Sequence, residues 1–422
     1  MTDRTDPSTV DVDLAMVGVG GAGLTVLHEL ALAARRLGPS TGRRWTVALC
    51  DDVDRLSQRP DDRTWCFWDR FDDPVDHHSL QRNPAKEALT ASWRHLAVLS
   101  PTARLELDLH PLRYAMLRAP DYYALVAADV ERATPWLETV RLGAATAVGD
   151  GADAASVRTV RGDVLARWVF DSRPAPPRSR AVTTLLQHFR GAVVRADPED
   201  LPRLPLLMDF RTPQPERGLS FGYCLPFAAD RALVEYTEFS PAVLDDAAYA
   251  AALAGYLDLA LDGAGHDVEH VEQGVIPMSD APYPRRAGRR VMRIGTAGGA
   301  TRASTGYTFR AMQRQAATMV EALVNDRVPV PPAPYPARHR FMDGVLLRAL
   351  DAHHVSGPDF FVRLFARNPT VRVMDFLDGA THLPADLALM ASAPPGAMLR
   401  SALEFGMRFG VGRTRPSRGG ER

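Results

Sequence analysis

A glycine-rich turn near the N-terminus constrains the fold of this chain more than any other sequence feature. A short, mostly apolar run at 13–17 comes directly before it, and apolar residues at helical spacing follow it. The turn has the pattern G-x-G-x-x-G, made by Gly18, Gly20 and Gly23. A second apolar run, 45–50, ends at Asp51. The segment 13–51 therefore predicts a strand, a helix and a second, parallel strand.

Such a turn is typical of dinucleotide binding. Glycines allow a tight turn, a close approach of the backbone to a pyrophosphate and close packing of the helix on the strand. The N–H groups at the start of the helix then face the phosphates, and Asp51 is expected to accept a hydrogen bond from a ribose hydroxyl. The alternative is a purely structural turn, and the motif by itself does not choose between FAD and NAD.

A segment late in the chain favours FAD. The run 291–295 predicts a third strand, which leads into a turn of small residues and then a helix from about 309 to 325. A late return to the cofactor is typical of FAD folds, because glycine lets the backbone approach the cofactor closely. The alternative is a plain loop. The residues expected to contact FAD here are Gly295, Thr296, Ala297 and Gly298.

Composition excludes several classes of protein. Lys and Arg number 50 and Asp and Glu 51, so the net charge of -1 argues against a dedicated nucleic-acid binder. Three cysteines without metal-ligand spacing predict neither a disulfide framework nor a metal site, and they favour a reducing, cytoplasmic setting. No apolar run approaches the roughly 20 residues of a membrane span.

The rest of the chain shows three kinds of pattern. A loop from 52 is expected to lead into a helix around 85–99, and 180–285 is rich in β-type residues and contains a predicted hairpin. Five prolines in 329–336 predict an extended linker. Beyond that linker the chain is predicted to be helical to about residue 409.

The string DRTWCFW at 62–68 resembles the signature of flavoprotein lycopene cyclases. Further strings that resemble this family follow in order and extend the resemblance over roughly residues 10–400. They are DSRP at 171–174, MDFR at 208–211, LPF at 225–227, LVEYT at 233–237, GVIPM at 274–278, IGTAGG at 294–299 and STGY at 304–307.

The resemblance implies an α/β protein with the Rossmann-like FAD-binding fold of aromatic hydroxylases, an inserted β-rich substrate domain and a C-terminal helical segment. It implies a lycopene β-cyclase of the isomerase class, which closes the ends of lycopene or a related acyclic or monocyclic carotenoid without net redox change. FAD is required in reduced form, typically with NAD(P)H as electron donor. The expected domains are 10–180, FAD-binding with a helical insertion; 181–288, β-rich and substrate-binding; 289–326, a return to the FAD-binding domain; 327–410, helical; and 411–422, a disordered tail.

The family's catalytic acid matches Glu235. Strand alternation places Glu235 on one face with Leu233 and Thr237, and Tyr236 on the other. Many members carry a second acid where this chain has Tyr236, so a second acid or base stays unassigned. Cyclisation needs a proton added, a carbocation held by negative charge or aromatic faces, and a proton removed. Candidate pocket aromatics are Trp65, Phe67, Trp68 and Tyr236, with core packing as the alternative.

A carotenoid resides in membranes, and residues 397–409 predict an amphipathic helix suited to a bilayer surface. Its apolar face is predicted to comprise Met398, Ala402, Phe405 and Phe409. The alternative is packing of that face on the protein. We expect a cytoplasmic protein bound peripherally to the inner face of the cell membrane, with other carotenoid-pathway enzymes as possible partners. Two further readings of function stay open: a redox FAD-dependent monooxygenase or prenyl reductase, and a non-catalytic carotenoid- or flavin-binding protein.

Overall fold

The computed structural model describes residues 10–70, 84–174 and 181–412, the last five of these by their backbone alone. The strand–helix–strand unit is confirmed as β1 (Val12–Val17), α1 (Gly21–Thr41) and β2 (Trp45–Cys50). β1 pairs in parallel with β2 on one side and with β11 (Gly162–Asp171) on the other. The predicted late strand is β17 (Val291–Arg293), which pairs in parallel with β11.

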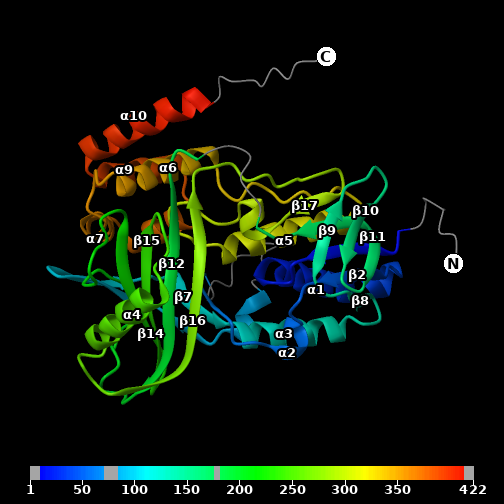
Figure 1. Cartoon of the computed structure of the whole chain (residues 1–422), viewed down its shortest axis with the longest axis horizontal. Helices are drawn as coiled ribbons and strands as arrows, with labels where there is room; N and C mark the ends of the chain where they lie inside the picture. The colour runs from blue at the N-terminus through cyan, green and yellow to red at the C-terminus, as the bar shows by residue number, and fades with distance from the viewer. Residues whose placement is uncertain (1–9, 71–83, 175–180, 413–422) are drawn as a thin grey trace.

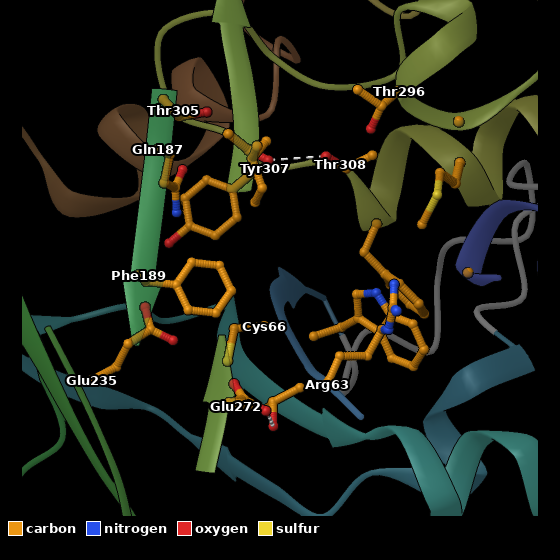
Figure 2. A pocket seen from close by; sticks show the side chains of 18 of the residues that line it. Arg63, Cys66, Gln187, Phe189, Glu235, Glu272, Thr296, Thr305, Tyr307 and Thr308 are labelled. Atoms are coloured by element: carbon orange, nitrogen blue, oxygen red, sulfur yellow. Dashed lines mark hydrogen bonds between the residues drawn. The ribbon is translucent and has the colours of Figure 1, made fainter. Parts of the chain in front are cut away.

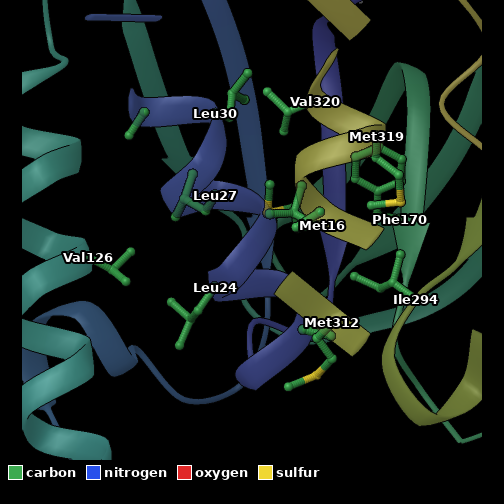
Figure 3. Close-up of a cluster of buried hydrophobic side chains, with 14 of the residues drawn as sticks. Met16, Leu24, Leu27, Leu30, Val126, Phe170, Ile294, Met312, Met319 and Val320 are labelled. Carbon is green, nitrogen blue, oxygen red and sulfur yellow. The ribbon is translucent and has the colours of Figure 1, made fainter. Parts of the chain in front are cut away.

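This first sheet has the order β8-β2-β1-β11-β10-β9, with β17 beside β11. Its remaining strands are β8 (Leu137–Arg141), β9 (Ala145–Gly149) and β10 (Ala155–Thr159). Helices α1, α3 (Ala119–Arg132) and α5 (Phe309–Val324) pack together beside the sheet (Figure 3). Their shared core includes Met16, Leu24, Leu27, Leu30, Val126, Phe170, Ile294, Met312, Met319 and Val320.

A second sheet stands beside the first (Figure 1) and has the order β16-β12-β15-β14-β13-β5-β6. Its strands are β5 (His95–Ser100), β6 (Ala103–Asp108), β12 (Thr184–Ala196), β13 (Leu206–Asp209), β14 (Leu219–Ala228), β15 (Arg231–Ser240) and β16 (His266–Ser279). The predicted hairpin is confirmed as β14 and β15. Helix α4 (Asp246–Ala260) packs on β12 and β15.

The helix predicted around 85–99 is wrong. That segment holds a short 3-10 turn, η1 (Pro84–Ala88), then β4 (Ala91–Trp93) and β5. Residues 96–99 are buried on both faces of the second sheet. A short apolar run buried on both faces has no periodicity that separates a strand from a helix.

A small third sheet, β3-β7-β4, contains the DRTWCFW string. β3 (Thr64–Asp69) pairs antiparallel with β7 (Arg113–Arg118), and the short helix α2 (Arg55–Gln58) precedes β3. This sheet brings the string to the inner side of the second sheet, because Thr64 of β3 contacts Glu272 of β16. The third sheet therefore closes the space between the two larger ones.

The predicted helical C-terminal region is confirmed as five helices along one edge of the molecule (Figure 1). They are α6 (Ala337–Asp351), α7 (Gly357–Arg367), α8 (Thr370–Leu377), α9 (Leu383–Ser392) and α10 (Pro395–Gly412). The predicted disordered tail, 411–422, lies outside the described residues from 413 onward. Among the helices that the structure describes, none combines the length and the apolar character needed to cross a membrane.

The apolar face predicted for α10 packs on the protein where it can be assessed, which is the alternative to contact with a bilayer. Phe405 is buried against Gly344 of α6, where an added Cβ would lie 2.5 Å from the ring. Met398 and Ala402 are half-buried, and the side chain of Phe409 lies outside the described residues. The exposed apolar side chains of α10 are instead Leu399, Leu403 and Met407. A glycine notch on α6 thus determines which apolar side of α10 packs inward.

Candidate functional site

A cavity of about 390 Å³ extends from the glycine turn to the inner face of the second sheet (Figure 2). The start of α1 and the turn after β17 line one end, and strands β12, β14, β15 and β16 line the other. β3 and the segment 305–309 complete the wall. Figure 2 shows Glu235 and Glu272 on one side of the cavity and Thr296 on the other.

The glycine turn has the geometry that phosphate binding requires. Gly18 has a φ of +83°, and an added Cβ would lie 2.2 Å from Ser172 Oγ. An added Cβ on Gly23 would lie 2.5 Å from the Gly18 carbonyl oxygen, so the helix packs directly on the turn. Gly20 instead faces open space, with no atom within 4 Å of an added Cβ. Gly20 is the N-cap of α1 and has no side chain that could cap the helix. The backbone N–H groups of the first turn of α1 are therefore available to a ligand.

Asp51 holds this turn in place. Its Oδ2 accepts hydrogen bonds from Val19 N at 2.5 Å and from Arg55 at 3.0 Å, and its Oδ1 accepts one from Val53 N at 3.0 Å. Burial opposes ionisation, but the hydrogen bonds from Val53 and Val19 and the charge of Arg55 outweigh it and keep the pKa of Asp51 below its ordinary value. A contact between Asp51 and a ribose stays a prediction.

The segment that follows β17 places a second glycine turn against the first. It forms a 3-10 turn, η2 (Gly295–Gly298), in which Gly295 has a φ of +62°. An added Cβ on Gly295 would lie only 2.8 Å from the Cβ of Ala22 in α1. Gly295 and Thr296 line the cavity, whereas Ala297 and Gly298 are buried behind them. Two backbone turns far apart in the sequence therefore share one end of the cavity.

Glu235 lies at the other end, on β15, and only 8% of it is exposed. The Thr237 hydroxyl donates a hydrogen bond of 2.6 Å to Glu235 Oε1. Burial, followed by the nearby charge of Glu272, raises the pKa of Glu235 to about 8. A carboxyl with this pKa is largely protonated at neutral pH, so it can act as a general acid.

Glu272 of β16 also lines the cavity, and sequence reasoning missed it. Only 6% of it is exposed, and the Thr64 hydroxyl donates a hydrogen bond of 2.9 Å to its Oε2. Burial raises the pKa of Glu272 to about 7. The sequence of the first part of β16 is typical of a solvent-facing strand, and in the structure the polar residues around Glu272 are largely exposed. The one available signal was its place two residues before the GVIPM string.

The four aromatic candidates occupy different places. Trp65 lines the cavity and lies 5.7 Å from the Phe309 ring, centroid to centroid. Phe67 stacks on the same Phe309 ring at 4.8 Å. Trp68 meets the Tyr307 ring edge to face at 4.6 Å. Neither Phe67 nor Trp68 is among the described residues that line the main cavity, so both act as a supporting layer behind its wall.

Tyr236 faces away from the cavity, as alternation along β15 requires. It packs in the cluster beneath α4, and its hydroxyl donates a hydrogen bond of 3.1 Å to Glu238. The aromatic side chains that do line the cavity include five that were not proposed from the sequence: Tyr114, Phe189, Tyr223, Tyr307 and Phe309. Burial raises the pKa of Tyr307 to about 12, so its ring carries a neutral hydroxyl. Within the described part of the chain, no cluster of His, Cys, Asp and Glu could hold a metal ion.

Comparisons with known proteins agree with this geometry. A family model described as "Lycopene cyclase protein" matches residues 13–403. A lycopene beta-cyclase from Paracoccus sp. (strain N81106 / MBIC 01143) is 38% identical over 113 residues, which cover 26% of this chain and 28% of that protein. The match thus spans less than a third of the relative's length.

Three solved structures are similar over nearly all of this chain. A geranylgeranyl bacteriochlorophyll reductase-like protein from Thermoplasma acidophilum has a TM-score of 0.59 at 14% identity and covers 93% of this chain and 99% of its own. The halogenase PltM has a TM-score of 0.56 at 13% identity, and the match covers 96% of this chain and 93% of PltM. The flavin-dependent monooxygenase PieE, solved with FAD and substrate, has a TM-score of 0.54 at 14% identity. The match covers 98% of this chain and 78% of PieE. These likenesses confirm the fold class, a Rossmann-like FAD-binding fold with a β-rich sheet and C-terminal helices.

Proposed function

The chain belongs to the lycopene cyclase protein family, whose model matches residues 13–403, and from this premise we propose that it is an FAD-dependent lycopene β-cyclase. The proposed reaction closes the open ends of lycopene to β-ionone rings, through γ-carotene to β-carotene, without net oxidation or reduction. The enzyme would then be an intramolecular lyase of the isomerase class. One observation carries this proposal: a single cavity joins the two glycine turns to the buried carboxyl group of Glu235, whose pKa burial raises to about 8.

The residues around the cavity suit each step of a cyclisation through a carbocation. Glu235 holds a proton near neutral pH and can deliver it to a double bond, because burial raises its pKa to about 8. Aromatic faces stabilise a positive charge that is shielded from water. The rings that line the cavity are Trp65, Tyr114, Phe189, Tyr223, Tyr307 and Phe309.

The residues at the opposite end fit FAD. The open space over Gly20 admits a phosphate, and the uncapped first turns of α1 and α5 supply N–H groups. Elsewhere in the cavity wall, two buried side-chain oxygens of the described residues, Gln187 Oε1 on β12 and Thr305 Oγ1, have no hydrogen-bond partner and are free to accept a hydrogen bond from a ligand. We propose that FAD is held by Gly18, Gly20, Gly23, Asp51, Gly295, Thr296, Ala297 and Gly298. In its reduced form, with NAD(P)H as electron donor, it would supply negative charge beside the carbocation.

The proposal is tested by expressing the chain in a bacterium that accumulates lycopene and analysing the pigments by chromatography and mass spectrometry. We expect cyclic products with the mass of lycopene. Glu235→Gln should leave lycopene unconverted, while the purified variant keeps its FAD. A product that gained oxygen or hydrogen would favour a monooxygenase or a prenyl reductase. Unconverted lycopene with flavin bound to the unmodified protein would favour a non-catalytic binding protein.

We also propose that the protein reaches its substrate from a membrane surface, through the C-terminal helices. Exposed apolar side chains lie there on α6, α9 and α10, and exposed apolar surface of this extent is typical of interaction sites. This C-terminal apolar patch consists of Phe341, Leu383, Leu387, Met390, Leu399, Leu403 and Met407. Leu399, Leu403 and Met407 recur every four residues, so they form one stripe along α10.

A second cavity of about 250 Å³ lies beneath the C-terminal apolar patch, and its wall is almost entirely apolar. Phe341, Met390 and Leu399 belong both to the patch and to the wall of this cavity. Ser304 lines the second cavity and its neighbour Thr305 lines the main one. One short loop therefore separates an apolar space under the patch from the space that contains Glu235, which supports delivery of a hydrocarbon from the bilayer.

A further inference from the structure

The two buried glutamates of the cavity lie on one rung of the second sheet. β12 runs between β15 and β16 and is antiparallel to both. Gly191 of β12 pairs with Glu235 on one side and with Glu272 on the other. Residues directly opposite each other in antiparallel strands project from the same face. Both carboxyl groups therefore enter the same cavity from either side of one glycine.

The glycine between them keeps the space between the two acids clear. A Cβ added to Gly191 would lie 3.3 Å from both the Cβ and the Cγ of Glu235, which is a tight contact. Any larger side chain at this position would stand between the two glutamates or displace Glu235. Gly191 thus leaves the surface of the sheet between the two glutamates free of a side chain.

Each carboxyl group is held by one threonine hydroxyl from a different part of the chain. Thr237, two residues along β15, donates to Oε1 of Glu235, and Thr64 of β3 donates to Oε2 of Glu272. One oxygen of each acid is thereby fixed, and each carboxyl keeps a second oxygen on which a proton can reside. The two acids are positioned alike but belong to different electrostatic surroundings.

Glu272 is the acid that releases its proton more readily. Burial raises the pKa of both groups, but Arg118 and Arg63 lie near Glu272 and oppose this rise, while Asp61 adds to it. The pKa of Glu235 is raised further by the charge of Glu272 itself. The other titratable groups near Glu235 are the hydroxyls of Tyr223 and Tyr307 and the thiol of Cys66. All three stay neutral near pH 7, because burial raises their pKa values.

We infer that Glu272 is the catalytic base that removes the proton lost on ring closure, as the partner of Glu235, which donates the first proton. This inference rests on the proposed cyclase function. The O–H bond of Glu235 breaks as a C–H bond forms at the terminal double bond, and a second double bond attacks the cation to close the ring. A C–H bond beside the new cation then breaks, its electron pair becomes the ring double bond, and its proton passes to Glu272.

The pair returns to its starting state by proton exchange with water. Glu235 is left as the anion and Glu272 carries the proton, so Glu272 releases its proton to solvent and Glu235 takes one up. Each turnover takes up one proton and releases one, and no electrons are exchanged. Tyr236 has no part in this exchange, because it lies on the opposite face of β15.

The test compares Glu272→Gln with the unmodified, FAD-loaded protein, using lycopene in phospholipid vesicles and the flavin reduced anaerobically. Loss of a general base should lower kcat about 100-fold or more, with the FAD content unchanged. Because Gln removes the charge that raises the pKa of Glu235, the alkaline limb of the pH–rate profile should move to lower pH. Glu272→Asp should recover part of the rate, and ring isomers other than β should rise in Glu272→Gln.

The matched control is Glu269→Gln on the same strand, which removes the charge of an exposed side chain and should leave rate and profile unchanged. The inference is overturned if Glu272→Gln keeps the rate and pH profile of the unmodified protein while Glu235→Gln is inactive. If the unmodified protein does not cyclise lycopene, or Glu235→Gln is fully active, the proposed function itself fails. Gly191→Val gives an independent check, since it should slow turnover without touching either carboxyl chemically.

Discussion

Replacing Glu235 by Gln is predicted to stabilise the protein while it abolishes cyclisation. Burial first, and the charge of Glu272 second, raise the pKa of Glu235 from its ordinary 4.5 to about 8. Within this window the folded chain keeps a proton on Glu235 that the unfolded chain has released. The free energy of unfolding therefore falls as pH rises from 4.5 to about 8, and it levels off above, where both states are deprotonated.

The size of the change in the free energy of unfolding follows from the two pKa values of Glu235. Each pH unit inside the window lowers the free energy of unfolding by about 1.4 kcal/mol, so the whole window amounts to about 5 kcal/mol. Relaxation around the carboxylate reduces this, and we expect Glu235→Gln to gain about 2–5 kcal/mol at pH 8. For a chain of this length that is a rise of several degrees in Tm. Near pH 5 the gain should shrink to about 1 kcal/mol or less, because this pH is close to the ordinary pKa of 4.5 and the unfolded chain also keeps part of its protons.

Scanning calorimetry of the FAD-loaded protein between pH 5 and pH 8 measures this directly. The control is Glu269→Gln, which removes exposed ion pairs with Arg195 and Arg231 and should show no gain that grows with pH. Equal Tm values for Glu235→Gln and the unmodified protein at pH 8 would refute the reasoning. They would mean that Glu235 ionises in the folded state without a penalty, and so does not store a proton.

Three further outcomes are expected. Gly20→Val should fold normally but lose FAD, because its side chain fills the open space over the turn. Flavin absorbance measures the FAD content, and full FAD loading would contradict the proposed phosphate site over Gly20. Leu403→Glu should lower co-sedimentation with anionic vesicles, whereas Val160→Glu, also exposed but outside the C-terminal apolar patch, should not. An equal loss in both variants would show that the patch does not bind the membrane. Arg302→Met should destabilise the fold by about 3–5 kcal/mol in chemical denaturation, because it leaves Asp343 buried without its ion pair; an unchanged midpoint would contradict that.

Local patterns in the sequence predicted the framework of the fold. The turn at Gly18, the strand ending before Asp51 and the late turn at Gly295 each depend on backbone conformations that neighbouring residues determine. The hairpin of β14 and β15 was predicted for the same reason, since strand alternation and a short turn are local signals. These elements also position the two glycine turns, so one end of the cavity followed from the sequence.

Other features depend on contacts between distant segments and could not be read from local pattern. Glu272 belongs to a strand of mostly exposed polar residues, and it is buried only because β3 covers it and supplies Thr64. The inward side of α10 depends on the notch that Gly344 leaves for Phe405. Both sides of that helix carry apolar residues, so periodicity alone did not separate the packed side from the exposed one.

The most direct test of proton-driven, non-redox cyclisation is the mass of the product formed in deuterium oxide, with the FAD-loaded protein reduced anaerobically. Glu235 exchanges its proton with solvent, and the deuteron that it delivers stays on carbon while a different proton is lost. The account predicts a product with the mass of lycopene in water, and one additional deuterium for each ring formed in deuterium oxide. A cyclic product without deuterium, or a product that gained oxygen or a pair of hydrogens, would contradict it.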